Sequence, residues 1–202
     1  MAVAPARPKI LLFDLGGVIV PWVGLEALAD LNKITRDEVA ERFNESEVFS
    51  AFERGNANEV EFLTELRRIF TLPDTDLVTL WNSWVRPPFP GTLEALADLK
   101  TRFTTACLSN INTLHWTHLN RMFNVENTFD FAFASHMINE AKPDALCYKK
   151  PIETMGCKTE DIWFFDDTQA NLEGARAVGL TAFHVDRAAG VLPLLRDLGL
   201  LP

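Results

Sequence analysis

The stretch KILLFDLGGV, residues 9–18, decides the fold of this chain. Its apolar run Lys9-Ile-Leu-Leu-Phe-Asp14 ends in a carboxylate, and the pair Gly16-Gly17 then breaks the extended pattern. Apolar runs that turn polar only at their end are typical of a central parallel strand buried on both faces. We therefore predict a buried strand here, with Asp14 at its carboxyl end.

Strand and helix patterns alternate after residue 91. We predict strands at 103–108, 129–134, 162–165 and 180–185, and helices at 92–100, 114–123, 144–155 and 171–178. This alternation predicts an α/β fold, a Rossmann-like doubly wound parallel sheet with helices on both faces. In such sheets the ligand lies beyond the carboxyl ends of the strands.

The segment between the first strand and residue 91 has a purely helical texture. Thr35 to Glu38 has the pattern of a capping box, Asp74 is a candidate helix cap, and apolar residues recur at helical spacing from Val60 to Phe70. We predict a bundle of about four helices that ends at the proline-rich run 87–91. The predicted domains are an α/β core, 1–20 with 91–202, and a helical insert, 21–90.

Composition limits the possible partners. The chain has 202 residues, 48% of them hydrophobic, and a formal net charge of −9, which argues against nucleic acid but not against a small phosphorylated metabolite held through a metal ion. Its three cysteines are too scattered for a disulfide framework or a zinc knuckle, which favours a reducing compartment. Since no apolar run is long enough to span a bilayer, we expect a cytoplasmic protein with no membrane contact. The oligomeric state stays open.

Four chemically active features follow predicted strands. They are Asp14, the pair Ser109-Asn110, Lys142, and the pair Asp166-Asp167. A carboxylate can attack phosphorus or carbon, and Mg²⁺ relieves the repulsion among clustered carboxylates. An ammonium and a hydroxyl can hold the remaining oxygens of a phosphoryl group, which supplies most of what phosphoryl transfer needs.

These residues stand in four ordered motifs, and together the motifs resemble the haloacid dehalogenase-like superfamily of hydrolases. The motifs are Phe13-Asp-Leu-Gly-Gly-Val18, Leu108-Ser-Asn110, Lys142-Pro-Asp144 and Phe164-Phe-Asp-Asp-Thr-Gln-Ala-Asn-Leu-Glu-Gly-Ala175. The match is closest to the branch that contains the phosphatase domain of soluble epoxide hydrolases and small bacterial sugar-phosphate phosphatases. The resemblance covers essentially the whole chain, because the helical insert looks like the C1 cap of the family.

The resemblance implies a role for each residue. Asp14 would be the nucleophile that forms an aspartyl-phosphate, and Lys142 would be the catalytic cation. Mg²⁺ would be held by Asp14, the Gly16 carbonyl and Asp167, with Asp166 in the same group, as a ligand or as the residue that holds Lys142 or a metal-bound water. The remaining phosphate contacts would come from Gly17, Ser109 and Asn110. Trp22 follows the first motif and is expected to line the substrate pocket. The stretch Phe52-Glu-Arg-Gly55 resembles the family's cap loop, in which Glu53 or Arg54 would contact the substrate, although a simple turn between helices also fits it.

Gly16 departs from the family pattern. Most of the family's phosphatases carry at this position a second Asp that protonates the leaving group, and its loss typically costs ~10²–10⁴ in rate. The substrate would then need a good leaving group, which favours a sugar 1-phosphate, or another side chain would donate the proton, with Glu140 and His115 as candidates. The third possibility is that the protein lacks this acid altogether and is a weak phosphatase.

Two other functions stay open. A 2-haloacid dehalogenase also lacks the second Asp and uses Asp14 to attack carbon, but it usually carries an Arg soon after the first motif. Here the first basic residue after Asp14 is Lys33, which disfavours that reading. The other possibility is a catalytically weak protein of the same fold that acts as a binding module. Gly16 is the only feature that supports it.

Overall fold

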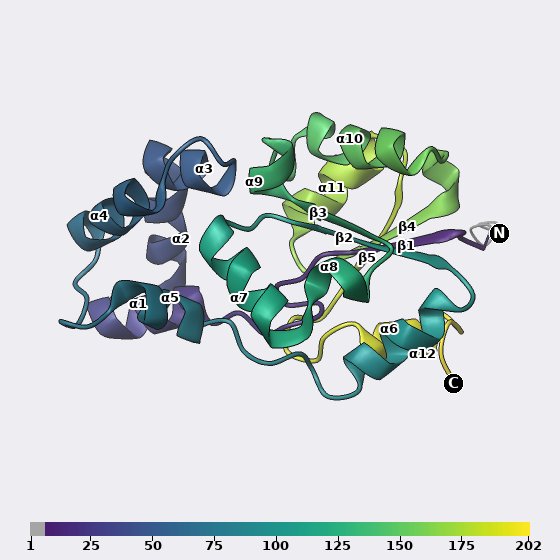
Figure 1. Ribbon diagram of the computed structural model, residues 1–202, viewed down its shortest axis with the longest axis horizontal. Coiled ribbons are helices and arrows are strands. Elements are labelled where there is room, and N and C mark those ends of the chain that lie inside the picture. The colour runs from purple at the N-terminus through teal and green to yellow at the C-terminus, as the bar shows by residue number, and fades with distance from the viewer. Residues whose placement is uncertain (1–6) are drawn as a thin grey trace.

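The computed structural model describes residues 7–202, and its centre is a five-stranded sheet in the order β3-β2-β1-β4-β5 (Figure 1). All four strand pairs are parallel, and β1 lies in the middle. This confirms the predicted α/β fold. The strands are β1 (Ile10–Phe13), β2 (Thr104–Ser109), β3 (Phe131–Ala134), β4 (Ile162–Asp166) and β5 (Thr181–His184).

Helices cover both faces of the sheet, because side chains along β1 alternate between two buried clusters. Leu11 and Phe13 belong to one cluster, and Ile10 and Leu12 belong to the other. The first face is covered by α6 (Thr92–Lys100), α7 (Thr113–Phe123), α8 (Val125–Thr128) and α12 (Leu192–Asp197). The second is covered by α10 (Ala145–Met155), which runs through Pro151, and α11 (Gln169–Ala177). Short α9 (Ser135–Ile138) follows β3, and the 3-10 turn η1 (Thr159–Asp161) precedes β4.

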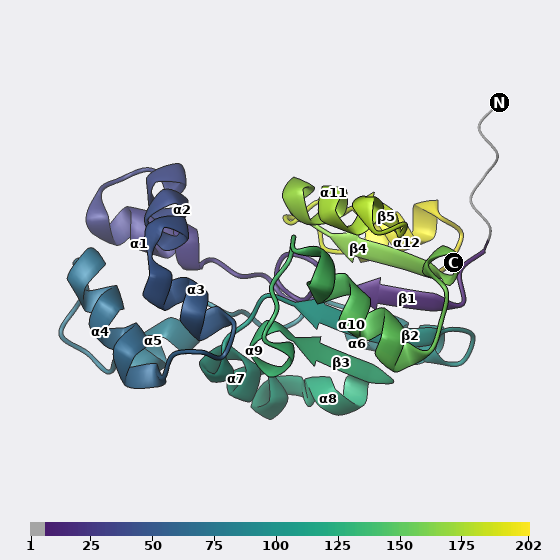
Figure 2. The same ribbon diagram turned by 90° about the horizontal axis from the view of Figure 1, so that it is seen from above.

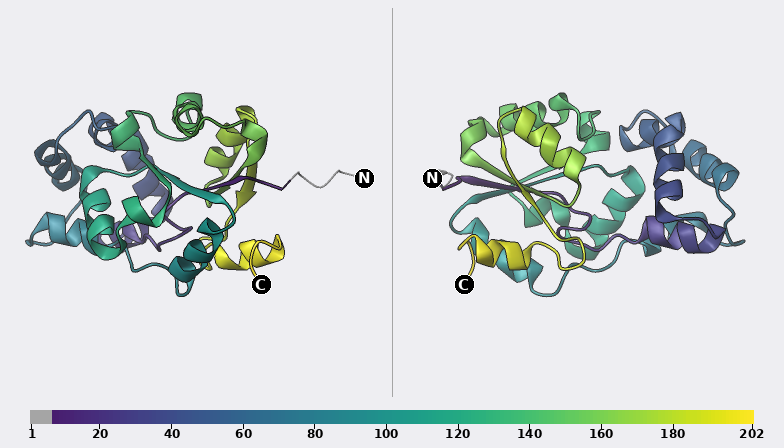
Figure 3. Two further views of the ribbon diagram at one scale, coloured as in Figure 1. Left: turned by 45° about the vertical axis from the view of Figure 1, so that its right-hand side comes forward. Right: turned by 180° about the vertical axis from the view of Figure 1, so that it is seen from behind.

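Five helices, which we call the cap, lie between β1 and α6. They are α1 (Gly24–Asn32), α2 (Arg36–Glu45), α3 (Glu47–Glu53), α4 (Glu59–Ile69) and α5 (Leu77–Ser83). They share an apolar core of their own, which includes Phe52, Phe62 and Trp81. Figure 2 shows the strands pointing toward these helices, and both views of Figure 3 place the C-terminus at the opposite end of the molecule. The carboxyl edge of the sheet therefore faces the cap.

Local differences from the sequence prediction have identifiable causes. The insert has five helices rather than about four, because the Ser46 side chain accepts a hydrogen bond from the Phe49 N–H and starts α3 directly after α2. The cap of α5 is Asp76, not Asp74. β3 begins at Phe131, two residues later than predicted, and helices α8, α9 and α12 were not predicted. The capping box of Thr35 and Glu38 is confirmed.

Contacts between the cap and the core centre on His115 of α7. Its Nε2 lies 3.1 Å from the Trp81 carbonyl oxygen, to which it donates, and its ring stacks on the Trp81 indole with centroids 4.7 Å apart. The two connections between cap and core are joined to each other, because Trp22, just before α1, and Val85, just after α5, form an isolated bridge. Among residues 7–202 no helix has the length and apolar character needed to cross a bilayer.

Burial of His115 makes the stability of this interface dependent on pH. Burial is the largest influence and lowers the pKa of His115 to about 4, against an ordinary value of 6.5. The unfolded chain therefore binds more protons between these pH values, so the free energy of unfolding falls as the pH drops from 6.5 toward 4. The loss from this residue is at most about 3 kcal/mol. We expect His115→Gln to remove this component.

Chemical denaturation of both proteins at pH 7 and at pH 5 measures the effect. The stability advantage of the wild type over His115→Gln should shrink at the lower pH. An advantage that stays constant would show that His115 is protonated equally in the folded and unfolded states.

Gly174 allows α11 to approach the loop that carries Lys142. A Cβ added at this position would lie 2.5 Å from the Pro143 carbonyl oxygen. We expect Gly174→Ala to destabilise the protein by ~1–3 kcal/mol, because overpacking outweighs the better helix propensity of alanine. The matched control is Ala177→Gly on the exposed side of the same helix, which should cost ~1 kcal/mol through propensity alone. Denaturation midpoints that rise in Gly174→Ala would contradict this assignment.

Candidate active site

The carboxyl edge of the sheet brings the predicted residues together. Asp14 follows β1 and continues its ladder, since the Asp14 N–H bonds to the Phe165 carbonyl at 2.8 Å. Ser109 ends β2, Asp166 ends β4, and Lys142 lies in the loop after α9. The sequence separates these residues by up to 152 positions, and parallel strand order places them at one point.

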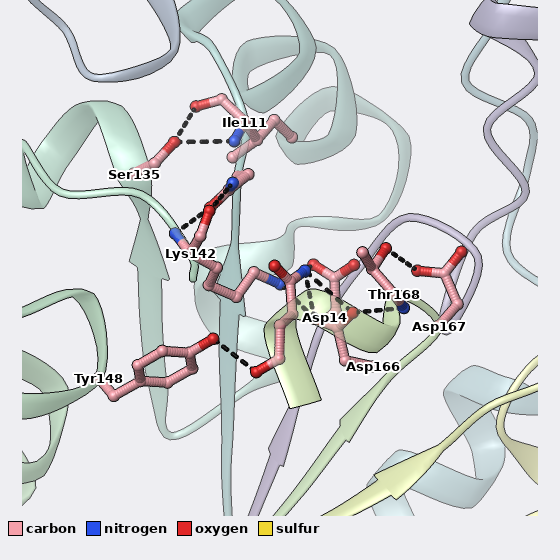
Figure 4. A network of polar contacts seen from close by, with 10 residues as sticks. Asp14, Ile111, Ser135, Lys142, Tyr148, Asp166, Asp167 and Thr168 are labelled. Carbon is pink, nitrogen blue, oxygen red and sulfur yellow. Dashed lines mark hydrogen bonds and ion pairs between the residues drawn. The ribbon is translucent and has the colours of Figure 1, made fainter. Parts of the chain in front are cut away.

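A buried ammonium holds two of the carboxylates. Lys142 Nζ lies 2.9 Å from Asp14 Oδ1 and 2.6 Å from Asp166 Oδ2, as Figure 4 shows. The side chains of Lys142 and Asp166 are 1% and 0% exposed. Burial alone would lower the pKa of Lys142, but the two carboxylates together raise it above its ordinary value. Lys142 is therefore a permanent cation at the floor of the site.

Both oxygens of the Asp166 carboxylate accept hydrogen bonds from protein groups. Besides Lys142, its carboxylate accepts hydrogen bonds from the Asn171 amide at 3.0 and 3.1 Å and from the Thr168 N–H at 2.8 Å. Asn171 is itself positioned by α11, and Tyr148 donates to its carbonyl oxygen at 2.7 Å. This geometry fits the supporting role for Asp166, which orients Lys142, better than a place among the metal ligands.

Asp14 and Asp167 form the part of the site that fits a cation. One oxygen or more from each of Asp14, Asp166 and Asp167 lies within 4.8 Å of the others. Burial and the neighbouring carboxylates raise the pKa of Asp14 to about 7, with Lys142 opposing them. Burial and Asp166 likewise raise the pKa of Asp167. Three carboxylates face the Lys142 ammonium and the Arg187 guanidinium, which lies 3.7 Å from Asp167. The negative charge that remains is one that a hard dication such as Mg²⁺ would balance.

Gly17 explains how Asp167 reaches this position. Its φ is +74°, which favours glycine, and a Cβ added there would lie 2.5 Å from Asp167 Oδ2. Gly16 lines the cavity above Asp14. Gly17 is not among the residues from 7 to 202 that line that cavity, so its predicted contact with phosphate stays a prediction.

Ser109 and Asn110 play different parts. Ser109 is buried and lines the cavity beside Asp14. The Asn110 side chain is engaged on both sides by the backbone of Lys142, accepting from its N–H at 2.8 Å and donating to its carbonyl at 2.9 Å. Asn110 thus holds the Lys142 loop in place, and Ser109 is the freer of the two for a phosphoryl oxygen.

The cap closes the other side of a cavity of about 520 Å³. Trp22, Glu53 and Arg54 line it together with Asp14 and Lys142 of the core. Arg54 is tied to the core by ion pairs, 2.8 Å to Asp144 and 3.9 Å to Glu140. The cavity therefore joins the carboxylates of the core to side chains of the cap.

Arg187 is a site residue that the sequence reasoning did not identify. Its Nε lies 3.7 Å from Asp167 Oδ2, its guanidinium donates to the Trp22 carbonyl oxygen at 3.2 Å, and it lines the cavity. It follows β5, so its place at the carboxyl end of a predicted strand was the available signal. The role of Asn171 was missed for a different reason, since only the tertiary structure shows its two bonds to Asp166.

Known proteins resemble the chain along most of its length. The most similar relatives include Phosphatase MT3486 of Mycobacterium tuberculosis, 28% identical over 93% of this chain and 94% of its own. Sesquiterpene phosphatase astK of Aspergillus oryzae is 26% identical over 94% of this chain and 96% of its own. A crystal structure of the HAD family enzyme bt-2542 from Bacteroides thetaiotaomicron, in complex with magnesium and inorganic phosphate, is 25% identical with a TM-score of 0.73. It covers 88% of this chain and 93% of that one.

The model of the family described as hydrolase, haloacid dehalogenase-like hydrolase, matches residues 8–179. That range includes strands β1 to β4 and every motif quoted above, and β5 lies just beyond it. The resemblance predicted from the four motifs is thereby confirmed, and the chain belongs to the haloacid dehalogenase-like hydrolase family.

Proposed function

We propose that the protein is a Mg²⁺-dependent phosphatase that hydrolyses small phosphate monoesters through an aspartyl-phosphate on Asp14. The observation that carries this proposal is the Lys142 ammonium held 2.9 Å from Asp14 and 2.6 Å from Asp166 beside a third carboxylate, Asp167. A fixed cation next to a nucleophilic carboxylate suits a phosphoryl group, whose oxygens carry the charge. The phosphatase names of two relatives support the same reaction.

Each residue has a distinct task in this proposal. Asp14 attacks phosphorus from the floor of the cavity, while Lys142 and the Ser109 hydroxyl hold phosphoryl oxygens. Asp166 and Asn110 keep Lys142 in place through their bonds to its side chain and backbone. Asp14, the Gly16 carbonyl and Asp167 would hold Mg²⁺. The ion would neutralise phosphoryl charge and relieve the repulsion among the carboxylates.

The alternatives fit the site less well. A dehalogenase that works without metal would keep Asp14, Asp166 and Asp167 within 4.8 Å of one another, with only the Lys142 ammonium and the more distant Arg187 guanidinium to balance three carboxylates. A pure binding module would not need a carboxylate such as Asp14 placed beside the Lys142 ammonium, where it can act as a nucleophile. A preference for sugar 1-phosphates follows only if no side chain protonates the leaving oxygen, since a C1 hydroxyl leaves more easily than an alkyl hydroxyl.

Hydrolysis of p-nitrophenyl phosphate tests the proposal. We expect turnover with Mg²⁺, none with EDTA, and a loss of more than ~1,000-fold in Asp14→Asn, because the nucleophile is gone. Asp197→Asn, an exposed carboxylate on α12, is the matched control and should keep full activity. Absence of turnover by the wild type, or full activity of Asp14→Asn, would overturn the phosphatase assignment.

Mg²⁺ should also stabilise the fold without any substrate. Binding to the folded state raises the free energy of unfolding by ~2.7 kcal/mol at a concentration 100 times the dissociation constant. Asp167→Asn should lose this response and, in EDTA, be at least as stable as the wild type, because the substitution removes one of the mutually repelling carboxylates. Thermal melts with Mg²⁺ and with EDTA measure both effects. A Mg²⁺ response that survives in Asp167→Asn would remove this residue from the ligand set.

A further inference from the structure

The proposed phosphatase reaction needs a proton for the oxygen that leaves phosphorus, and Gly16 supplies no carboxyl. The need for another proton donor rests on that proposed function. A general acid must lie on the far side of the phosphoryl group from Asp14, since attacking and leaving oxygens are roughly in line. The cap helices lie beyond the carboxyl edge of the sheet that carries Asp14 (Figure 2), so cap side chains that line the cavity are candidates for this acid.

The two acids suggested by the sequence are already engaged. Glu140 pairs with Lys150 Nζ at 3.0 Å and with Arg54, and it is not among the described residues that line the cavity. His115 lines the cavity, but its Nε2 proton is committed to the Trp81 carbonyl. With a pKa of about 4, its ring is neutral near pH 7 and holds no spare proton. Neither residue therefore serves as the acid.

Glu53 is a cap carboxyl that is free. It ends α3 and lines the same cavity as Asp14 and Lys142. Within residues 7–202, no hydrogen bond or ion pair reaches its carboxylate. The other charged cap residues on the cavity, Arg36 and Arg54, carry guanidinium groups that keep their protons and pair with Glu26 and Asp144.

The backbone around Glu53 is fastened to the core. Ser135 Oγ donates to the Glu53 carbonyl oxygen at 2.6 Å, and Asn139 Nδ2 donates to the Arg54 carbonyl oxygen at 2.9 Å. Figure 4 shows Ser135 bonded in turn to Ile111, in the loop after β2. The ion pair between Arg54 and Asp144 adds a third tie. Glu53 is thus held at a fixed place over the core, as a group that acts on substrate must be.

The surroundings of Glu53 favour a carboxyl that keeps its proton. Burial is the dominant influence and raises the pKa of Glu53, while the nearby charges of Lys142 and Arg54 lower it in part. Both cations are largely neutralised by carboxylates of their own, Lys142 by Asp14 and Asp166, and Arg54 by Asp144 and Glu140. An acid with a raised pKa operates closer to neutral pH.

We propose that Glu53 of the cap is the general acid and base of the reaction, in place of the carboxyl missing at Gly16. In the first step an Asp14 oxygen bonds to phosphorus and the bond from phosphorus to the leaving oxygen breaks. The leaving oxygen takes the bonding electron pair and the Glu53 proton, which yields a neutral alcohol and a Glu53 carboxylate. In the second step water attacks phosphorus and gives its proton to Glu53, and the bond from phosphorus to Asp14 breaks. Phosphate is released with both side chains restored.

The test compares two substrates of similar shape that differ in their leaving group. Phenyl phosphate releases a poor leaving group that needs a proton, and p-nitrophenyl phosphate releases a good one that needs it little. We expect Glu53→Gln to lower kcat/KM for phenyl phosphate at least ~10-fold more than for p-nitrophenyl phosphate, because only the former depends on the acid. Glu47→Gln, an exposed carboxyl on the same helix, is the control and should leave the ratio of the two rates unchanged.

The outcomes separate this proposal from the proposed function. Equal losses on both substrates, or no loss on phenyl phosphate, overturn the role of Glu53 while the phosphatase assignment stands. No hydrolysis of either substrate by the wild type overturns both. Thermal melts of Glu53→Gln accompany the kinetics and show whether the variant is folded. The proposal is supported if the variant is folded and its kcat/KM depends more steeply on the leaving group than that of the wild type. The variant should also prefer glucose 1-phosphate over glucose 6-phosphate more strongly than the wild type does.

Discussion

The ion pairs of Lys142 with Asp14 and Asp166 are the interaction on which the rest of the molecule depends. Charges this deeply buried are tolerated only when they are paired and hydrogen-bonded, and breaking such a pair by removing one partner typically costs ~3–5 kcal/mol. The pairing requires the ends of β1 and β4 to lie next to each other and the loop after α9 to reach across them. Asn110, Asn171 and the close approach at Gly174 all serve that geometry. The strand order of the sheet and the geometry of the site therefore depend on each other.

The cap completes what the core leaves unfinished. The core supplies carboxylates, an ammonium and a hydroxyl at the edge of the sheet, but at Gly16 it supplies no acid for the far side of the substrate. The cap is held on the core by the stacking of His115 on Trp81 and by the hydrogen bonds around Glu53, so its side chains line the cavity. The division of labour proposed here places the nucleophile in the core and the acid in the cap.

Sequence reasoning was most accurate where the signal is local. The run before Asp14 predicted a central buried strand, and the capping box at Thr35 and Glu38 is present as expected. It was less accurate at short elements. Ser46 begins a separate helix within one residue of the end of α2, and the six-residue α12 has too few turns to show a helical period. The cap of α5 was misplaced by two residues because Asp74 and Asp76 are both good helix caps in the sequence.

The sequence by itself determined the carboxylates, the ammonium and the hydroxyl of the site, because strand ends and motif order are local properties and parallel strands bring their carboxyl ends to one edge. What each group does was decided by tertiary structure. Asp166 holds Lys142 across 24 residues, Asn110 holds its backbone across 32, and Arg187 reaches Asp167 from the end of another strand. The burial that keeps His115 neutral and the backbone bond from Ser135 that holds Glu53 over the core both depend on contacts between cap and core. Such contacts join residues far apart in the chain, and their geometry leaves no pattern in the local sequence.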